Sequence, residues 1–447
     1  MDFYINKKRK KALLTTVPMP EISIINQVPG RIIRPNELDS IEDCLIVANN
    51  ESFLGGRSQP AIGLHFLKEN VPSVDILEFP KWDDYEEALK NNYDVVGISF
   101  YTTHFYAAKK MAKMAKEAGI KEVWAGNFGA LTPGVSDYFD RAFIGCAEND
   151  LKIALENEAI KEVKHPVITT PFSAVLRSGE KAGYIFTSRG CKFKCEFCCS
   201  PIFFQGSDTI SLSEIERVLD IYRDMGINYI NVGDETFLQN HGHAKKVINL
   251  MHKRDMKWFC TSRADLILGN VEELKEKGFN SVYMGIESMN DDNLLDQNKG
   301  QYTEKIIAVL DELKHYGIST SGTYILGLDK DTKESIKNDL ERLNKLLINI
   351  LIFIIFTPYP ELPLYPKWKK DGKIIHDNWK EYDGLHMVFK HPFLSPEEAK
   401  ETLNYAVCNV YSPYNYNKRR VLRRLDQLKR EKESLKVQTR EVLTIKN

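Results

Sequence analysis

The segment Cys191-Lys-Phe-Lys-Cys195-Glu-Phe-Cys198 places three cysteines in one short loop, directly after an apolar stretch at 184–188 that predicts a buried strand. Thiolate is the soft ligand that iron–sulfur clusters prefer, and three thiolates in a short loop can hold three irons of a cubane cluster. No fourth protein ligand is evident beside them. The spacing therefore predicts a 4Fe-4S cluster with one iron open to a substrate or cofactor.

A structural zinc site is the alternative for these cysteines. Zinc sites favour four ligands in two C-x2-C pairs. The second pair is missing here, because Cys260 stands alone and Cys199 adjoins Cys198 too closely to be a natural fourth ligand. The remaining cysteines are expected to be ordinary buried thiols: Cys44, Cys146, Cys260 and Cys408.

The cysteine loop opens a regular series in which apolar strand patterns alternate with helical patterns. Six strand–helix units fit into roughly 180 residues, which predicts a partial (β/α)6 barrel over 181–365. The expected strands are 184–188, 229–232, 257–261, 281–285, 319–326 and 351–357.

A first series of the same kind covers 1–165 and predicts an α/β fold with a doubly wound, Rossmann-like parallel sheet. Ligands bind such sheets at the carboxyl ends of the strands. The stretch 166–180, with two prolines, predicts a linker, and 366–447 predicts a carboxyl-terminal helical segment. The expected strands of the first series are 12–17, 74–79, 94–100, 122–126 and 141–145.

Composition and charge are those of a soluble globular protein. Of the 447 residues 43% are hydrophobic, and 61 basic residues face 62 acidic ones, so we expect no nucleic-acid partner. No secretory signal is evident at the start, and the longest apolar run, 346–356, is too short to span a bilayer. These features predict a cytoplasmic protein.

The cysteine spacing, with an aromatic residue before the last cysteine, resembles the signature of the radical S-adenosylmethionine (SAM) superfamily. The resemblance continues through the second series, where polar motifs follow successive strands. It implies cluster ligands at Cys191, Cys195 and Cys198. It implies SAM contacts at Phe197, Gly233, Asp234, Glu235, Arg263, Glu287 and Ser288.

The resemblance also implies a mechanism. The open iron would chelate the amine and carboxylate of SAM, and one electron from the reduced cluster would cleave a carbon–sulfur bond of SAM. The resulting 5′-deoxyadenosyl radical would remove a hydrogen atom from a substrate. A low-potential electron donor is thereby implied as a partner, and we expect sensitivity to oxygen.

The first series is similar to the cobalamin-binding domain that one class of this superfamily carries. Segments 60–67, 94–99, 125–127 and 145–148 fall where that class has its helix, third strand and two glycine turns. The implied cobalamin contacts are Thr102, Thr103, Gly126, Asn127, Gly129 and Glu148.

The chain departs from this class at three motifs. Ala-Gly-Asn-Phe stands for the usual Gly-Gly-Pro-His, and Gly-Cys-Ala-Glu stands for Gly-Glu-Gly-Glu. The segment 357–365 resembles the Thr-Pro-x-Pro-Gly-Thr-Pro-Leu-Tyr motif, but Glu361 and Leu362 replace its Gly-Thr. Because some members have lost cobalamin, these departures leave cobalamin binding open.

The favoured function is methylation of an unactivated carbon, with cobalamin carrying the methyl group. The alternative is a cobalamin-independent radical reaction, such as carbon–carbon bond formation, cyclisation or rearrangement on a lipid or natural product. The substrate expected is a small molecule, a lipid or a peptide.

The tail at 418–432 is a basic sequence with apolar residues at helical spacing. We expect a solvated helix whose leucines pack on the barrel. The alternative is a basic amphipathic helix that lies on an anionic membrane surface.

Overall fold

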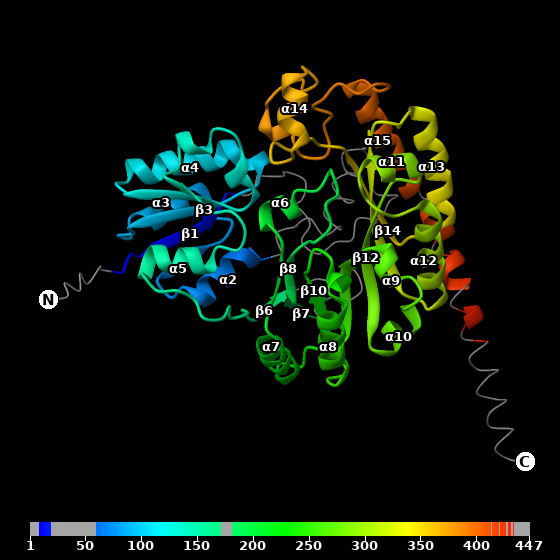
Figure 1. Cartoon of the computed structure of the whole chain (residues 1–447), viewed down its shortest axis with the longest axis horizontal. Helices are drawn as coiled ribbons and strands as arrows, with labels where there is room; N and C mark the ends of the chain where they lie inside the picture. The colour runs from blue at the N-terminus through cyan, green and yellow to red at the C-terminus, as the bar shows by residue number, and fades with distance from the viewer. Residues whose placement is uncertain are drawn as a thin grey trace, which may run out of the picture.

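The computed structural model describes residues 9–18, 60–170, 181–412, 414–419, 421–425, 428–430 and 432. Over this range the chain forms two α/β parts that lie side by side (Figure 1). Cys44 and residues 171–180 of the predicted linker lie outside the described residues.

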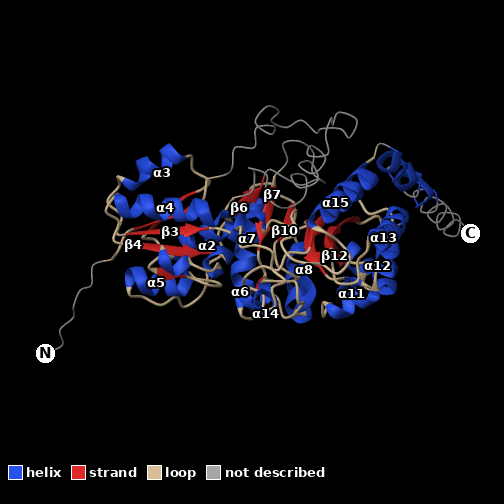
Figure 2. Ribbon diagram, turned by 90° about the horizontal axis from the view of Figure 1, so that it is seen from above, coloured by secondary structure: helices blue, strands red, loops and turns tan. Residues whose placement is uncertain are grey.

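The amino-terminal part is a five-stranded parallel sheet in the order β2-β1-β3-β4-β5, which confirms the predicted doubly wound sheet. Its strands are β1 (Ala12–Thr16), β2 (Val74–Leu77), β3 (Val95–Ser99), β4 (Glu122–Gly126) and β5 (Arg141–Ala142). Its helices are α2 (Ile62–Asn70), α3 (Trp82–Leu89), α4 (Phe105–Glu117) and α5 (Glu148–Glu156). Figures 1 and 2 show α3 and α4 on one face of this sheet and α5 on the other.

Side-chain alternation along β1 divides the core of this part into two layers. Leu13 packs in the cluster that includes residues of α3 and α4. Its neighbours Ala12 and Leu14 pack in the cluster that includes residues of α2 and α5. The sheet is therefore covered on both faces, and its carboxyl edge is left for ligands.

The second part is a seven-stranded sheet in the order β14-β13-β12-β11-β10-β7-β6. Its strands are β6 (Ile168–Thr170), β7 (Ala182–Ile185), β10 (Tyr229–Val232), β11 (Lys257–Ser262), β12 (Phe279–Glu287), β13 (Ser319–Leu326) and β14 (Ile350–Ile355). The six strands from β7 to β14 pair in parallel, which confirms the predicted partial barrel.

The stretch predicted to be a linker contributes the antiparallel edge strand β6. Ile168 exchanges two hydrogen bonds with the buried hydroxyl of Tyr222, at 2.7 and 2.9 Å. The expectation of a linker fails there because this long-range contact is invisible in a proline-rich local sequence.

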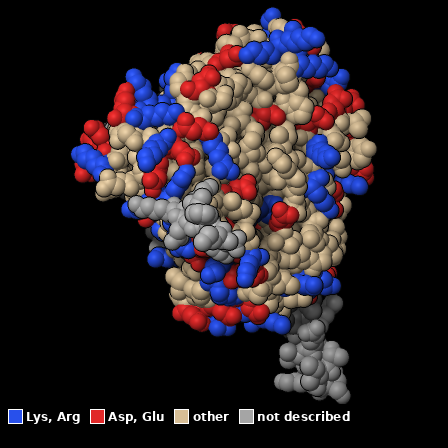
Figure 3. Space-filling model, turned by 60° about the vertical axis from the view of Figure 1, so that its left-hand side comes forward, with Lys and Arg blue, Asp and Glu red and all other residues tan. Residues whose placement is uncertain are grey.

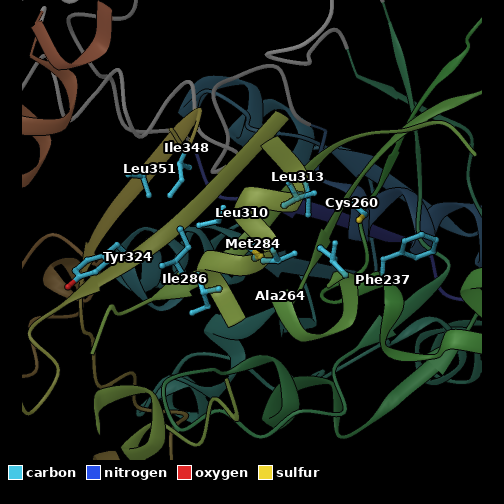
Figure 4. Close-up of a cluster of buried hydrophobic side chains, with 14 of the residues drawn as sticks. Phe237, Cys260, Ala264, Met284, Ile286, Leu310, Leu313, Tyr324, Ile348 and Leu351 are labelled. Atoms are coloured by element: carbon cyan, nitrogen blue, oxygen red, sulfur yellow. The ribbon is translucent and has the colours of Figure 1, made fainter. Parts of the chain in front are cut away.

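Helices cover the outer face of the second sheet, and their apolar sides form its core (Figure 4). They are α7 (Leu212–Asp224), α8 (His241–His252), α9 (Ala264–Ile267), α10 (Val271–Glu276), α11 (Asp291–Asp296), α12 (Thr303–His315) and α13 (Lys333–Lys345). Cys260 is fully buried in this core, as predicted. Cys146, by contrast, is exposed in the loop before α5, so the expectation of a buried thiol there was wrong.

The carboxyl-terminal segment adds α14 (Leu364–Lys370) and α15 (Pro396–Tyr411). Tyr365, Trp379 and Tyr382 join the core of the amino-terminal sheet, whereas α15 packs on α13 and β14. This segment therefore contacts both parts of the chain.

Positive and negative side chains are intermixed over the face that Figure 3 shows. None of the described helices has the length and apolar character needed to cross a bilayer.

Candidate active site

The three predicted cluster cysteines lie in a loop closed by a hairpin. β8 (Ser188–Gly190) runs antiparallel to β9 (Ser207–Thr209), and α6 (Ser200–Phe204) follows the cysteines. Gly190 has φ 90°, and a side chain on it would overlap the carbonyl of Gly206. Only glycine meets both demands, so this residue fixes the direction in which Cys191 leaves the strand.

Asp234 anchors the chain just before this loop. Its Oδ1 accepts a hydrogen bond from the Thr187 amide at 2.6 Å, and its Oδ2 accepts bonds from the Thr187 hydroxyl and from the Ser188 amide and hydroxyl at 2.6–2.8 Å. Burial raises the pKa of this carboxyl to about 6, against the lowering effect of these bonds. Both oxygens are thus engaged in holding β8, and a SAM contact by Asp234 stays a prediction.

Glu235 and its neighbours hold the other side of the loop. Its Oε2 accepts a hydrogen bond from the Gly190 amide at 2.7 Å, and burial raises its pKa to about 7. Gly233 leaves no room for a side chain because the Tyr184 ring fills that space. Gln239, which sequence reasoning missed, donates to the Gly190 carbonyl at 2.8 Å. No sequence signal marks Gln239, since its partner lies far away in the chain.

Arg263 brings a positive charge to the thiols. Its Nη1 lies 3.9 Å from the Sγ of Cys195, and its guanidinium lies 3.9 Å from the centre of the Phe193 ring. An ion pair with Asp265 at 3.0 Å and a hydrogen bond to the Lys299 carbonyl at 2.6 Å fix its position. The prediction placed Arg263 at the end of β11, and the structure brings it to the cysteine loop.

A buried ion pair lies at the end of β12. Glu287 and Lys299 are joined at 3.0 Å and are both less than a tenth exposed. Glu287 has φ 63° at a β-bulge, and a side chain on Gly285 would displace the ends of the Glu287 and Lys299 side chains. Ser288 is fully buried beside them, and the Lys299 Nζ lies 5.6 Å from the Phe197 ring centre. Sequence reasoning found Glu287 but not its partner Lys299.

The donor set of this loop suits an anionic metal cluster. Burial raises the pKa of the thiols of Cys195 and Cys198, while Lys299 and Arg263 lower that of Cys195. The two cations would stabilise the thiolate form that binds iron. Among the described residues, no three His, Cys, Asp or Glu side chains converge on a single metal ion. In a cubane cluster each thiolate binds a different iron.

Across from this loop lies the carboxyl edge of the amino-terminal sheet. Thr102, after β3, shares a 3.0 Å hydrogen bond with Thr132 and donates to Oε1 of Glu361 at 2.7 Å. Thr103 is the next residue and is partly exposed. The second oxygen of Glu361, Oε2, is buried and has no hydrogen-bond partner among the described residues. Burial raises the pKa of this carboxyl.

The predicted glycine turn after β4 has two different roles. Gly129 must be glycine, because a side chain would overlap the Phe100 ring. A methyl group on Gly126 would meet only the Ile98 carbonyl oxygen, at an ordinary contact distance of 3.9 Å. Asn127 has φ 64°, and its side chain accepts a hydrogen bond from the Phe128 amide at 2.9 Å. The turn thereby aims Phe128 away from the sheet.

Two contacts join this edge to the cysteine loop. The Phe128 ring stacks on Phe203 of α6 at a centroid distance of 4.3 Å, and Figure 1 shows α6 between the two parts. Glu148 forms a buried ion pair with Arg189, two residues before Cys191. Glu148 is therefore engaged within the protein, and its predicted contact with cobalamin stays a prediction.

Comparison with known proteins identifies the second part. Residues 185–343 match the Radical SAM superfamily. The second part of the chain is therefore a radical SAM domain. Its radical SAM domain implies a 4Fe-4S cluster and SAM as cofactors, with Cys191, Cys195 and Cys198 as the candidate ligands.

Relatives of this radical SAM protein share most of its length. An uncharacterized methyltransferase of Pyrococcus horikoshii is 27% identical over 80% of this chain and 88% of its own. The bacteriochlorophyllide d C-8(2)-methyltransferase of Chlorobaculum tepidum is 25% identical over 68% of this chain and 75% of its own.

A solved structure extends the likeness to both parts. The radical SAM methyltransferase TsrM from Kitasatospora setae, with cobalamin and a 4Fe-4S cluster bound, matches with a TM-score of 0.64. The match covers 91% of this chain and 89% of TsrM at 13% identity, so the likeness concerns the fold.

Proposed function

We propose that this radical SAM enzyme methylates an unactivated carbon with the help of cobalamin. The observation that carries the proposal is that the ligand-binding edge of the amino-terminal sheet faces the cysteine loop. The stacked rings of Phe128 and Phe203 and the ion pair of Glu148 and Arg189 hold the two faces together. The two-part fold of TsrM and the names of the relatives support the same function.

The residues at the cysteine loop suit SAM. Arg263 and Lys299 offer positive charge near Cys195, and Glu235 and Glu287 offer carboxylates. We infer that this polar ring orients SAM while the surrounding barrel excludes water.

The opposite edge suits a corrin. The edge is lined by Thr103, Gly126 and Asn127, which are not fully engaged inside the protein. An amide group of the corrin could donate a hydrogen bond to Oε2 of Glu361, which has no partner among the described residues. When bound, the cluster and SAM supply one-electron activation of a carbon–hydrogen bond, and cobalamin supplies the methyl group.

A small-molecule substrate and an electron donor follow from the radical SAM family. We infer that the substrate, whether small molecule, lipid or peptide, enters between the two faces. Contact of the carboxyl-terminal helix with a membrane surface is a separate proposal that does not depend on methyl transfer.

The test is an anaerobic assay of the reconstituted protein with cobalamin supplied. We expect the wild type and Cys408→Ala, a control on α15, to form 5′-deoxyadenosine from SAM and dithionite, and Cys195→Ala to form none. Corrin retained on the protein supports methyl transfer, whereas activity without corrin favours the cobalamin-independent alternative. Zinc in place of iron would overturn the proposal.

A further inference from the structure

The last described helix turns Arg419, Arg423 and Arg430 toward the barrel and its leucines outward, while Arg424 is exposed. Residues 414–419, 421–425 and 428–430 are helical. Arg419 is 3% exposed and donates to Asn344 at 2.9 Å, and Arg423 donates to the Leu347 and Ile348 carbonyls at 3.0 and 2.6 Å. The exposed fractions of Val421, Leu422, Leu425 and Leu428 are 57%, 38%, 48% and 44%. The expectation that these leucines pack on the barrel was wrong.

The ends of two barrel helices explain this orientation. The last carbonyls of a helix lack intrahelical partners and carry partial negative charge. Arg430 reaches the Lys314 carbonyl in the last turn of α12, which also accepts a hydrogen bond from the Gly317 amide. Arg423 reaches the Leu347 and Ile348 carbonyls in the loop that follows α13. Guanidinium groups satisfy these carbonyls better than leucines can, so the basic face of the helix is turned toward the barrel.

The opposite face combines exposed apolar and basic side chains. We call Val421, Leu422, Leu425 and Leu428 the apolar stripe. Lys418, Lys429 and Lys432 are exposed on the same helix, and Tyr414 is 73% exposed near its start. We propose that the apolar stripe docks on an anionic membrane surface, with the flanking lysines contacting lipid headgroups.

Charge selects this partner over a second copy of the chain. From residue 418 onward the sequence has eleven Lys and Arg against four Asp and Glu, while the whole chain has a net charge of −1. Two such helices packed stripe to stripe would bring like charges together, whereas an anionic surface neutralises them.

The same geometry disfavours a nucleic acid. Phosphate binding would use outward arginines, but Arg419, Arg423 and Arg430 donate to groups of the barrel. The face left outward carries the apolar stripe as well as exposed basic residues, and binding to phosphates would leave the stripe uncovered.

The docking itself does not depend on methyl transfer. Taken together with the proposed function, on which this conclusion rests, membrane docking favours a substrate that dissolves in the bilayer.

The test is vesicle flotation of the full chain. We expect the wild type to float with vesicles of phosphatidylcholine and phosphatidylglycerol, but not with phosphatidylcholine alone. The double variant Leu422→Glu/Leu425→Glu should bind the anionic vesicles at least about tenfold more weakly, because the burial of two leucines in the bilayer surface is lost. Leu295→Glu is the matched control, because Leu295 is 68% exposed on α11, and it should float like the wild type.

Three outcomes overturn the proposal. The first is a wild type that stays at the bottom with anionic vesicles, and the second is a double variant that floats equally well. The third is a wild type that does not bind vesicles but instead forms a dimer in sedimentation, which the double variant loses, or shifts labelled RNA in a gel. Equal iron content and melting temperature in all variants exclude misfolding as the cause. None of these measurements depends on catalytic activity, so the proposed function is tested separately.

Discussion

Thr102 and Glu361 are 259 residues apart in the chain and are joined by a 2.7 Å hydrogen bond between the amino-terminal sheet and the segment that follows the barrel. Glu361 stands where the resembling motif has glycine. Its second oxygen is buried beside the carboxyl edge of β3 and has no partner among the described residues. A buried carboxylate oxygen without a donor costs free energy, so a bound group is expected to satisfy it.

The first prediction concerns Glu361. In Glu361→Ala, the affinity for hydroxocobalamin should fall about tenfold, which is the size of one hydrogen bond to a charged group. Thr102 keeps Thr132 as a partner, so the fold should persist. Corrin bound per protein by absorbance measures the effect, with Glu341→Ala on the exposed side of α13 as the control. Equal corrin affinity in both variants would show that Oε2 faces no corrin.

The second prediction concerns the ion pair of Glu148 and Arg189, whose side chains are 5% and 11% exposed. Glu148→Ala leaves a buried guanidinium without its carboxylate and should lower the free energy of unfolding by about 3 kcal/mol or more. Glu158→Ala removes the partner of Arg9 from an exposed pair and should leave the melting temperature unchanged. Anaerobic thermal unfolding compares the two variants. If they melt alike, the buried pair contributes nothing to stability.

The third prediction uses two glycines with opposite surroundings. Gly129→Ala should lower the melting temperature, because the new methyl group overlaps the Phe100 ring. Gly63→Ala has open space on α2 and should raise stability by about 0.5–1 kcal/mol, because alanine restricts the unfolded chain. Opposite shifts are expected in thermal unfolding, and shifts of the same sign would contradict the packing described for Gly129.

The fourth prediction is a pH dependence from Asp331. This carboxyl is 2% exposed, accepts bonds from the Gly327 and Leu328 amides at 2.9 and 3.1 Å, and has its pKa raised by burial to about 7. A raised folded-state pKa gives stability that is present below the unfolded value near 4 and is lost as pH rises toward 7. The excess stability of the wild type over Asp331→Asn should therefore shrink between pH 5 and pH 8.

Melting temperatures at both pH values measure this difference. Asp296→Asn serves as the control, because Asp296 is 45% exposed and pairs only with Lys330 on the surface. A wild-type advantage over Asp331→Asn that is constant with pH would mean that Asp331 titrates normally in the folded protein.

The sequence alone determined the cysteine loop, the succession of parallel strands along both series and the polar residues at the strand ends. These features depend on spacing and periodicity within a few residues. The C-x3-C-x2-C spacing restricts three thiols to one loop, and strand–helix alternation imposes parallel pairing in both parts.

Only the tertiary structure decided which of these polar groups are engaged within the protein. Asp234 holds Thr187 and Ser188, Glu287 pairs with Lys299, and Glu361 reaches Thr102. The tail shows the reason most plainly. Its pattern predicts an amphipathic helix, but its orientation depends on the Leu347 and Ile348 carbonyls after α13 and the Lys314 carbonyl of α12, which lie far earlier in the chain and which no local pattern reveals.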